Sequence, residues 1–249
     1  MLHGRSLGDG RVSTERLVAA CASLTADVLA LQEVDRNQAR SGHVDQTAAV
    51  AGGMDAAAWR FEPALVGEPG ATWRAATEED DPASTEAGYG VGLVSRLPVR
   101  AWYVVRLQAA KVRAPVAVPG GRGRFILLPD EPRVAVAAEI ETVNGPLLVA
   151  TTHLSFVPGW NLVQLRTVTG ALAALGPPCV LLGDLNVPGP LPALATGWRA
   201  LAKAKTFPGP NPSMQIDHAL GHGLLPVVAG ADAPELPLSD HRALVVDFL

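Results

Sequence analysis

Residues 133–154 read RVAVAAEIETVNGPLLVATTHL, and they carry the clearest structural pattern in the chain. An Asn-Gly pair at 144–145 separates two runs of strand-forming residues, which predicts a β-hairpin. The next segment, from Trp160 to Leu175, has a helical pattern that ends at Gly176-Pro177-Pro178. A short apolar run, CVLLGDLN at 179–186, then predicts a buried strand that ends in a carboxylate.

The same alternation extends outward in both directions. Ser13 can cap a helix that runs to about Leu24, and a second helix is expected over Val44–Ala51. Further strands are expected at VLALQEVD (28–35), GYGVGLVS (88–95), VRAWYVVRL (99–107), QIDHAL (215–220) and HRALVVDF (241–248), and the Gly- and Pro-rich residues 108–132 are expected to form mostly loop. No linker divides the chain, so we expect one α+β domain over residues 1–249, with packed sheets and flanking helices.

The composition excludes several classes of protein. The 249 residues are 48% apolar and 18% charged, which is too apolar for a disordered chain. The net charge of −4 argues against broad phosphate neutralisation on nucleic acid. No run approaches the roughly 18 apolar residues of a membrane span, and the N-terminus lacks the features of a signal peptide. With Cys21 and Cys179 expected as buried thiols, we expect a soluble cytoplasmic protein.

Polar side chains follow five of the apolar runs. Any one of them has an ordinary explanation as a turn or a solvated loop residue, but five together suggest a shared site at the strand ends. These residues are Glu33, His153, Asp184 with Asn186, Asp217 with His218, and Asp240 with His241. Converging carboxylates without thiolates favour a hard cation such as Mg²⁺ or Mn²⁺. With histidine and amide donors added, the set suits attack on a phosphate ester.

The motifs LQEVD, THLS, GDLN, IDHAL and SDHRALVVDF occur in the order seen in the endonuclease/exonuclease/phosphatase superfamily. The chain resembles that superfamily from Leu31 to Phe248, including pancreatic-type deoxyribonucleases, abasic-site endonucleases, sphingomyelinases and inositol-polyphosphate phosphatases. The resemblance implies a four-layer αββα sandwich of two mostly antiparallel sheets. It also implies hydrolysis of a phosphate ester with Mg²⁺ or Mn²⁺.

The resemblance also implies separate roles for the site residues. Glu33 matches the principal metal ligand, and Asp240 matches a second carboxylate near the metal. Asp184 matches the group that orients or deprotonates the attacking water, and Asn186 the amide that holds the scissile phosphate.

The remaining matches concern histidines. His241 matches the histidine at the phosphate, as a general base or an oxyanion donor, and Asp217 matches the buried partner that fixes its tautomer. His153 matches a donor to the phosphate or to the leaving oxygen. His218 follows Asp217 directly, so in a strand it points to the opposite face and is expected to be structural.

One departure from the superfamily pattern lies at the N-terminus. Members normally open with a buried strand that ends in a metal-side Asn, followed shortly by Gly, and MLHG resembles the piece just after that Asn. The first strand is therefore expected to be missing from the numbered chain, with Met1 internal to a longer natural protein or, alternatively, the start of a shortened member. Its absence is expected to leave a vacant or substituted strand position beside LQEVD and CVLLGDLN and to weaken metal binding.

Three functions remain open from the sequence. The leading expectation is a metal-dependent phosphoesterase that acts on a small or lipid-derived phosphodiester. The excess of acidic over basic residues and the dispersed tryptophans do not favour nucleic acid as the substrate. A nuclease is the first alternative, and a local basic rim formed by Lys111, Arg113, Arg122, Arg124 and Arg133 is possible. A non-catalytic binding or scaffold protein that keeps the fold is the alternative from another class. Oligomeric state and substrate are not encoded in these patterns.

Overall fold

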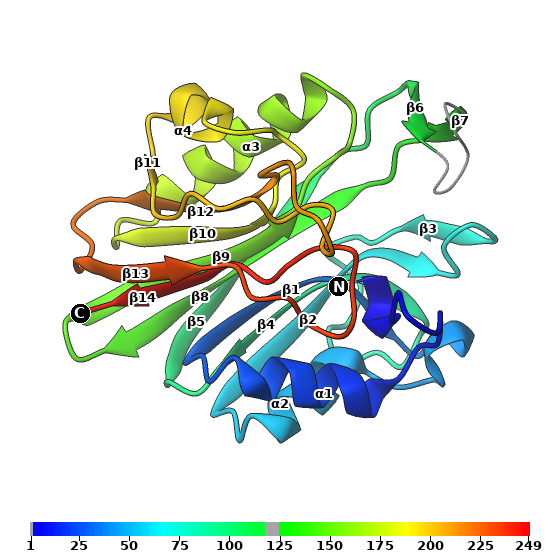
Figure 1. Ribbon diagram of the computed structural model, residues 1–249, viewed down its shortest axis with the longest axis horizontal. Coiled ribbons are helices and arrows are strands. Elements are labelled where there is room, and N and C mark those ends of the chain that lie inside the picture. The colour runs from blue at the N-terminus through cyan, green and yellow to red at the C-terminus, as the bar shows by residue number, and fades with distance from the viewer. Residues whose placement is uncertain (1, 118–124) are drawn as a thin grey trace.

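The computed structural model describes residues 2–117 and 125–249 as two large sheets packed between two groups of helices (Figure 1). The first sheet has the order β1-β4-β2-β3. Its strands are β1 (Val28–Arg36), β2 (Ala58–Gly67), β3 (Trp73–Ala75) and β4 (Gly88–Ser95). Helices α1 (Thr14–Ser23) and α2 (Gln46–Gly53) cover its outer face.

The second sheet has the order β11-β12-β10-β9-β8-β5. Its strands are β5 (Val99–Leu107), β8 (Arg133–Thr142), β9 (Gly145–His153), β10 (Cys179–Asp184), β11 (Arg199–Ala200) and β12 (Asp217–His222). Helices α3 (Trp160–Ala173) and α4 (Leu191–Thr196) cover its outer face. Only β9 and β10 pair in parallel within these two sheets. The expected four-layer αββα sandwich is therefore confirmed.

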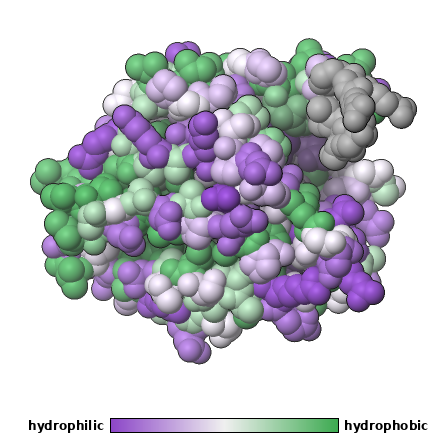
Figure 2. Space-filling view, viewed as in Figure 1, coloured by the Kyte–Doolittle hydropathy of each residue, from purple (hydrophilic) through white to green (hydrophobic). Residues whose placement is uncertain are grey.

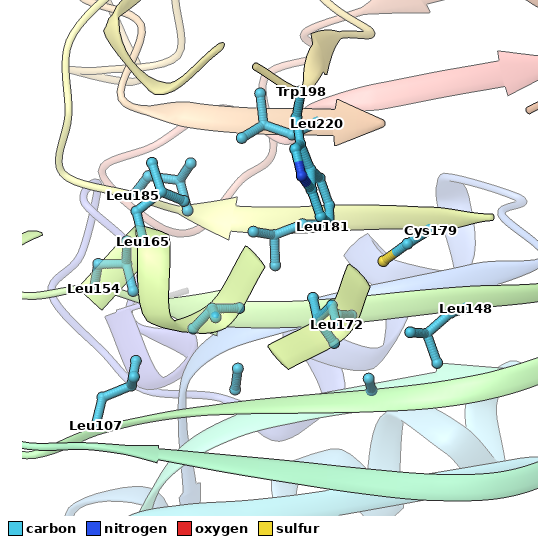
Figure 3. Packing of buried hydrophobic residues seen from close by; sticks show 14 of the residues in the cluster. Leu107, Leu148, Leu154, Leu165, Leu172, Cys179, Leu181, Leu185, Trp198 and Leu220 are labelled. Atoms are coloured by element: carbon cyan, nitrogen blue, oxygen red, sulfur yellow. The ribbon is translucent and has the colours of Figure 1, made fainter. Parts of the chain in front are cut away.

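Alternation along β9 and β10 explains how one sheet fills two cores. Leu148 and Leu181 point toward α3, where Leu165 and Leu172 pack against them (Figure 3). The neighbouring Leu182 faces the other way, toward the first sheet and the C-terminal strands. Each face of a central strand is therefore apolar, as the unbroken apolar run predicts.

Most expected elements form close to their expected bounds. Ser13 caps α1 by accepting the N–H of Arg16, and the hairpin at 144–145 joins β8 and β9. α2 begins two residues later than expected, because Asp45 rather than an earlier residue caps it. No helix in the described ranges combines the length and hydropathy needed to cross a membrane.

The loop expected over residues 108–132 is partly wrong. It contains a two-stranded hairpin of β6 (Arg113–Ala117) and β7 (Phe125–Pro129), which projects from the sandwich (Figure 1). Of the basic rim, Arg122 and Arg124 lie outside the described residues, and Arg133 is buried at the start of β8.

The C-terminal strands form a separate two-stranded sheet. It consists of β13 (Val228–Asp232) and β14 (Val245–Phe248), and β14 pairs only with β13 among the described strands. The strand expected over 241–248 is therefore short, and His241 lies in the preceding loop. The apolar run at the start of β1 is typical of a central strand buried on both faces, but β1 is an edge strand with Val28, Leu29 and Ala30 half-buried.

Between the edges of β1 and β14 lies a cavity of about 990 Å³. It is lined by consecutive residues of both strands, 28–33 and 243–249. A cavity thus lies beside LQEVD, where a vacant strand position was expected. The same expectation for CVLLGDLN is wrong, because β10 pairs with β9 on one side and with β12 on the other.

Candidate active site

Five elements bring polar side chains to one end of the sandwich. β9 ends at His153 and its parallel neighbour β10 ends at Asp184, so the two residues are in register. β12 runs antiparallel to β10 and begins at Asp217, directly across from Asp184. The expectation that Asp217 ends an apolar run is therefore wrong in detail, because an antiparallel strand reaches the same edge with its first residue.

A histidine and two carboxylates form the centre of the site. His241 Nδ1 lies 2.8 Å from Asp217 Oδ2, and His241 Nε2 lies 3.9 Å from Asp184 Oδ2. Ligand atoms of these three residues all lie within 4.8 Å of one another. Because Asp217 accepts at Nδ1–H, it directs the Nε2 atom of the imidazole toward Asp184.

The protonation of Asp184 and His241 depends on their burial and on the neighbouring Asp217. Burial and the nearby Asp217 raise the pKa of Asp184 to about 7, although His241 opposes the shift. Burial lowers the pKa of His241, but the hydrogen bond and charge of Asp217 outweigh it and the net shift is upward. Asp184 can therefore gain or lose a proton near neutral pH, and the upward shift in pKa moves His241 toward its charged form.

His153 is the second histidine that lies close to Asp184. Its Nε2 atom lies 3.7 Å from Asp184 Oδ2, and its Nδ1 atom lies 3.4 Å from Nη1 of Arg133. Arg133 can only donate, so Nδ1 accepts and the ring proton sits on Nε2. Burial and the charge of Arg133 lower the pKa of His153 to about 3, which keeps the ring neutral.

Glu33 lies at a distortion of β1. The β1–β4 register shifts between Gln32 and Val34, and Glu33 adopts φ 57°. A non-glycine residue in this region is strained, and such strain concentrates at functional sites. Burial opposes the charge of Glu33, but the positively charged N-terminal amine, His241 and the N–H of Leu2, which donates at 3.0 Å, hold its pKa at about 2. Glu33 is therefore a buried carboxylate that remains ionised.

Asn186 follows β10 with φ 50° and supports Asp184. Its backbone N–H donates to Asp184 Oδ1 at 2.9 Å, and its side-chain amide donates to the carbonyl of Leu154. Gly183, just before Asp184, has no room for a side chain, because a Cβ would lie 2.0 Å from the carbonyl oxygen of Thr152. The GDLN motif therefore fixes the carboxylate through backbone geometry.

Asp240 directly precedes His241 in the chain, and no side-chain contact ties it to the other described site residues. Its backbone carbonyl accepts the N–H of Gly209 at 2.6 Å, but its carboxylate makes no hydrogen bond or ion pair with a described residue of the site. His218 is buried and its Nε2 lies 2.8 Å from the carbonyl of Val187. It therefore has the structural position that strand alternation predicts.

Two contributors were missed from the sequence. Thr206 is fully buried and its hydroxyl donates to Asp217 Oδ2, but a single threonine in a loop gives no pattern. Arg133 was assigned to a basic rim, yet it is buried beside His153. Its place as the first residue of β8, in the strand that pairs with β9, was the available signal.

Replacing Thr206 with valine is expected to destabilise the protein by about 1–3 kcal/mol, because Asp217 loses a buried donor. Urea unfolding of the metal-free protein measures the change. Thr167→Val on the exposed face of α3 is the control and is expected to change stability little. Equal stability of T206V and the parent would contradict the assigned hydrogen bond.

The fold and the site together define a class of protein: an αββα sandwich with a carboxylate–histidine centre at one end of its paired sheets. Residues 3–241 match the model of the endonuclease/exonuclease/phosphatase family. The chain belongs to this family, as its motifs predicted. Endonucleases, exonucleases and phosphatases all cleave phosphate esters, so the chain is a phosphoester hydrolase.

Solved structures show the same fold at low sequence identity. An endonuclease/exonuclease/phosphatase from Beutenbergia cavernae is 21% identical with a TM-score of 0.66, over 98% of this chain and 68% of that one. The human Nocturnin catalytic domain with bound sulfate is 19% identical with a TM-score of 0.63, over 100% and 90%. A mannosyl-6-phosphatase from Bacteroides thetaiotaomicron is 17% identical with a TM-score of 0.53, over 94% and 91%. No curated protein matches the sequence significantly.

Proposed function

We propose that this protein is a divalent-metal-dependent phosphodiesterase whose site comprises Glu33, His153, Asp184, Asn186, Asp217, Asp240 and His241. The observation that carries the proposal is the arrangement around Asp184, whose Oδ2 atom lies within 4 Å of Nε2 of both His241 and His153. A carboxylate that can take a proton, flanked by two imidazole N–H groups, suits attack of water on a phosphorus atom.

The donor set suits a hard cation. Glu33 is buried and ionised, and no thiolate lies in the cluster, which favours Mg²⁺ or Mn²⁺ over softer metals. Glu33 is the proposed principal ligand and Asp240 the proposed second carboxylate. A bound Mg²⁺ or Mn²⁺ would supply Lewis-acid stabilisation of charge on a phosphoryl oxygen.

The protein's own side chains act on the attacking water, the phosphate and the leaving oxygen. Asp184 accepts a proton from water as the water oxygen bonds to phosphorus. His241, held by Asp217, donates Nε2–H to a non-bridging oxygen of the phosphate. The side-chain N–H of Asn186 that is not bonded to Leu154 donates to the same phosphate. The bond from phosphorus to the leaving oxygen breaks while neutral His153 donates a hydrogen bond from Nε2–H to that oxygen and keeps its proton. The leaving oxygen is protonated by solvent, and Asp184 returns its proton to solvent.

A small or lipid-derived phosphodiester is the proposed substrate class. The net charge of −4 gives no broad attraction for nucleic acid, and Arg133, which lies 3.4 Å from His153, is buried rather than exposed along a groove. The two free cysteines are buried, with their pKa values raised to about 12 by desolvation, so they suit the reducing cytoplasm that we propose as its location.

Hydrolysis of bis(p-nitrophenyl) phosphate tests the reaction. With Mg²⁺ or Mn²⁺ we expect release of p-nitrophenol, and we expect EDTA to reduce the rate to background. Turnover that persists in EDTA would contradict metal dependence. Inactivity of both this chain and a form extended by an apolar N-terminal strand would support the scaffold alternative, and faster cleavage of single-stranded or abasic DNA would favour a nuclease.

A further inference from the structure

Asp130 is a buried carboxylate that the proposed reaction does not use. Figure 2 shows hydrophilic side chains spread over the surface of the molecule, but the side chain of Asp130 is 0% exposed and that of Arg133 is 7% exposed. Asp130 opens the short connection between β7 and β8, and Arg133 is the first residue of β8. A buried charge loses its hydration, so each of these two groups needs compensation inside the protein.

One carboxylate oxygen of Asp130 joins two loops beside the catalytic centre. Oδ2 accepts the backbone N–H of Ala110 at 2.7 Å, in the loop after β5, and the hydroxyl of Ser155 at 2.8 Å, in the loop after β9. The other oxygen, Oδ1, is buried without a hydrogen-bond partner among the described residues, and it lies 3.8 Å from Nη2 of Arg133. Oδ2 therefore has a structural role, while Oδ1 acts on Arg133 through its charge.

Arg133 connects this carboxylate to His153. Its Nη2 atom lies toward Asp130, and its Nη1 atom lies 3.4 Å from Nδ1 of His153. A guanidinium is planar and rigid, so a charge that holds one of its nitrogens also sets the direction of the others. Nε2 at the far side of the His153 ring lies 3.7 Å from Asp184 Oδ2. A continuous chain of polar contacts therefore runs from Asp130 to the carboxylate that faces the attacking water.

The orientation of Arg133 favours the contact with His153 over its own hydrogen bonding. Its Nε atom is buried and has no hydrogen-bond partner among the described residues. An unpaired buried donor costs free energy, and local costs of this kind are typical of functional sites. Neutralising the charge of Arg133 does not require this orientation, whereas presenting Nη1 to the imidazole does.

We propose that Asp130 is a positioning residue for the reaction, which holds Arg133 against Nδ1 of His153 and so keeps the Nε2–H of that histidine available to the leaving oxygen. Without the charge of Asp130, the guanidinium turns away from the ring, and the neutral imidazole then also carries its proton on Nδ1. Nε2 of that second tautomer has a lone pair and donates no hydrogen bond. The effect on turnover rests on the proposed function, but the effect on the tautomer does not.

The tautomer of His153 in Asp130→Asn tests this chain of contacts without a substrate. Asparagine keeps an oxygen for the N–H of Ala110 and the hydroxyl of Ser155, but it places no charge beside Arg133. In ¹⁵N NMR spectra of the metal-free protein, we expect the parent to hold the His153 proton on Nε2 alone and D130N to show a mixture with the Nδ1–H form. Ser155→Ala is the matched control, since it loses a loop hydrogen bond, keeps the ion pair and is expected to retain the parent tautomer.

Two diesters with different leaving groups give the second readout. Diphenyl phosphate has a poor leaving group that depends on a donor, whereas p-nitrophenolate leaves readily without one. We expect D130N to lower kcat for diphenyl phosphate about tenfold with little change in KM, and to lower kcat for bis(p-nitrophenyl) phosphate less than about twofold. In an Arg133→Met background, D130N is expected to cause no further loss, because Asp130 acts only through Arg133.

Arg133→Met also serves if D130N does not fold, because it leaves both loop hydrogen bonds of Asp130 in place, and the same Nδ1–H form is expected. The parent tautomer in D130N, or in R133M should D130N not fold, would overturn the proposal. Equal losses of kcat on both diesters, or losses that multiply in the double variant, would also overturn it, because Asp130 would then be only structural. If the parent hydrolyses neither diester, the proposed function fails, and the tautomer still decides the role of Asp130.

Discussion

Asp184→Asn is expected to reduce turnover by about 10²-fold or more, because the variant cannot take a proton from the attacking water. Asparagine can still accept the N–H of Asn186, so the loop geometry after β10 is retained. Steady-state hydrolysis of the chromogenic diester measures the effect. Asp232→Asn, at an exposed position, is the matched control and is expected to leave turnover unchanged.

The same substitution is expected to stabilise the metal-free protein at pH 8. The folded-state pKa of Asp184 is about 7 against an ordinary value of 3.8, so between these pH values the unfolded chain releases a proton that the folded chain retains. Stability is therefore lost as the pH rises through this window, at roughly 1.4 kcal/mol per pKa unit, and the loss is complete above about pH 7. Asparagine avoids this loss.

Urea unfolding at pH 4 and pH 8 separates the two effects. D184N is expected to be close to the parent at pH 4 and more stable by a few kcal/mol at pH 8. A stability difference that is the same at both pH values would contradict the burial of an ionisable group at this position.

His241→Ala is also expected to reduce turnover by about 10²-fold or more, since it removes the charged donor nearest to Asp184. Its partner Asp217 keeps the hydroxyl of Thr206, so the fold is expected to survive. His222→Ala, at an exposed residue stacked on Trp198, is the control and is expected to retain normal turnover. A folded H241A variant with near-normal turnover would exclude the proposed role of His241.

The sequence predicted the sandwich because its main strands have local signals. The Asn-Gly turn specifies the β8–β9 hairpin, and the apolar run before Asp184 specifies a central strand with two buried faces. The β6–β7 hairpin was missed because its exposed apolar residues, such as Leu127, lie among glycines and prolines and follow no burial pattern. β1 has the sequence of a central strand, yet among the described strands it pairs only with β4. The neighbours of a strand depend on the tertiary structure, and its local sequence does not encode them.

The sequence indicated which residues form the site better than it indicated how they contact one another. Strand ends indicated Asp184 and His153, and register then brings them together. The contacts of Asp217 with Thr206 and of His153 with Arg133 depend on loops and strand pairing that no local pattern encodes. The left-handed conformation of Glu33 arises from a register shift in β1, and the sequence gives no signal for it.

The most direct test of the proposed reaction centre is the position of bound Mn²⁺ in a crystal of the protein, found from its anomalous scattering. We expect one Mn²⁺ within ligand distance of a Glu33 carboxylate oxygen, at the end of the sheets where Asp184 and His241 meet, and no such Mn²⁺ in Glu33→Gln. Mn²⁺ bound elsewhere, or a site without Mn²⁺ at saturating concentration, would contradict the account.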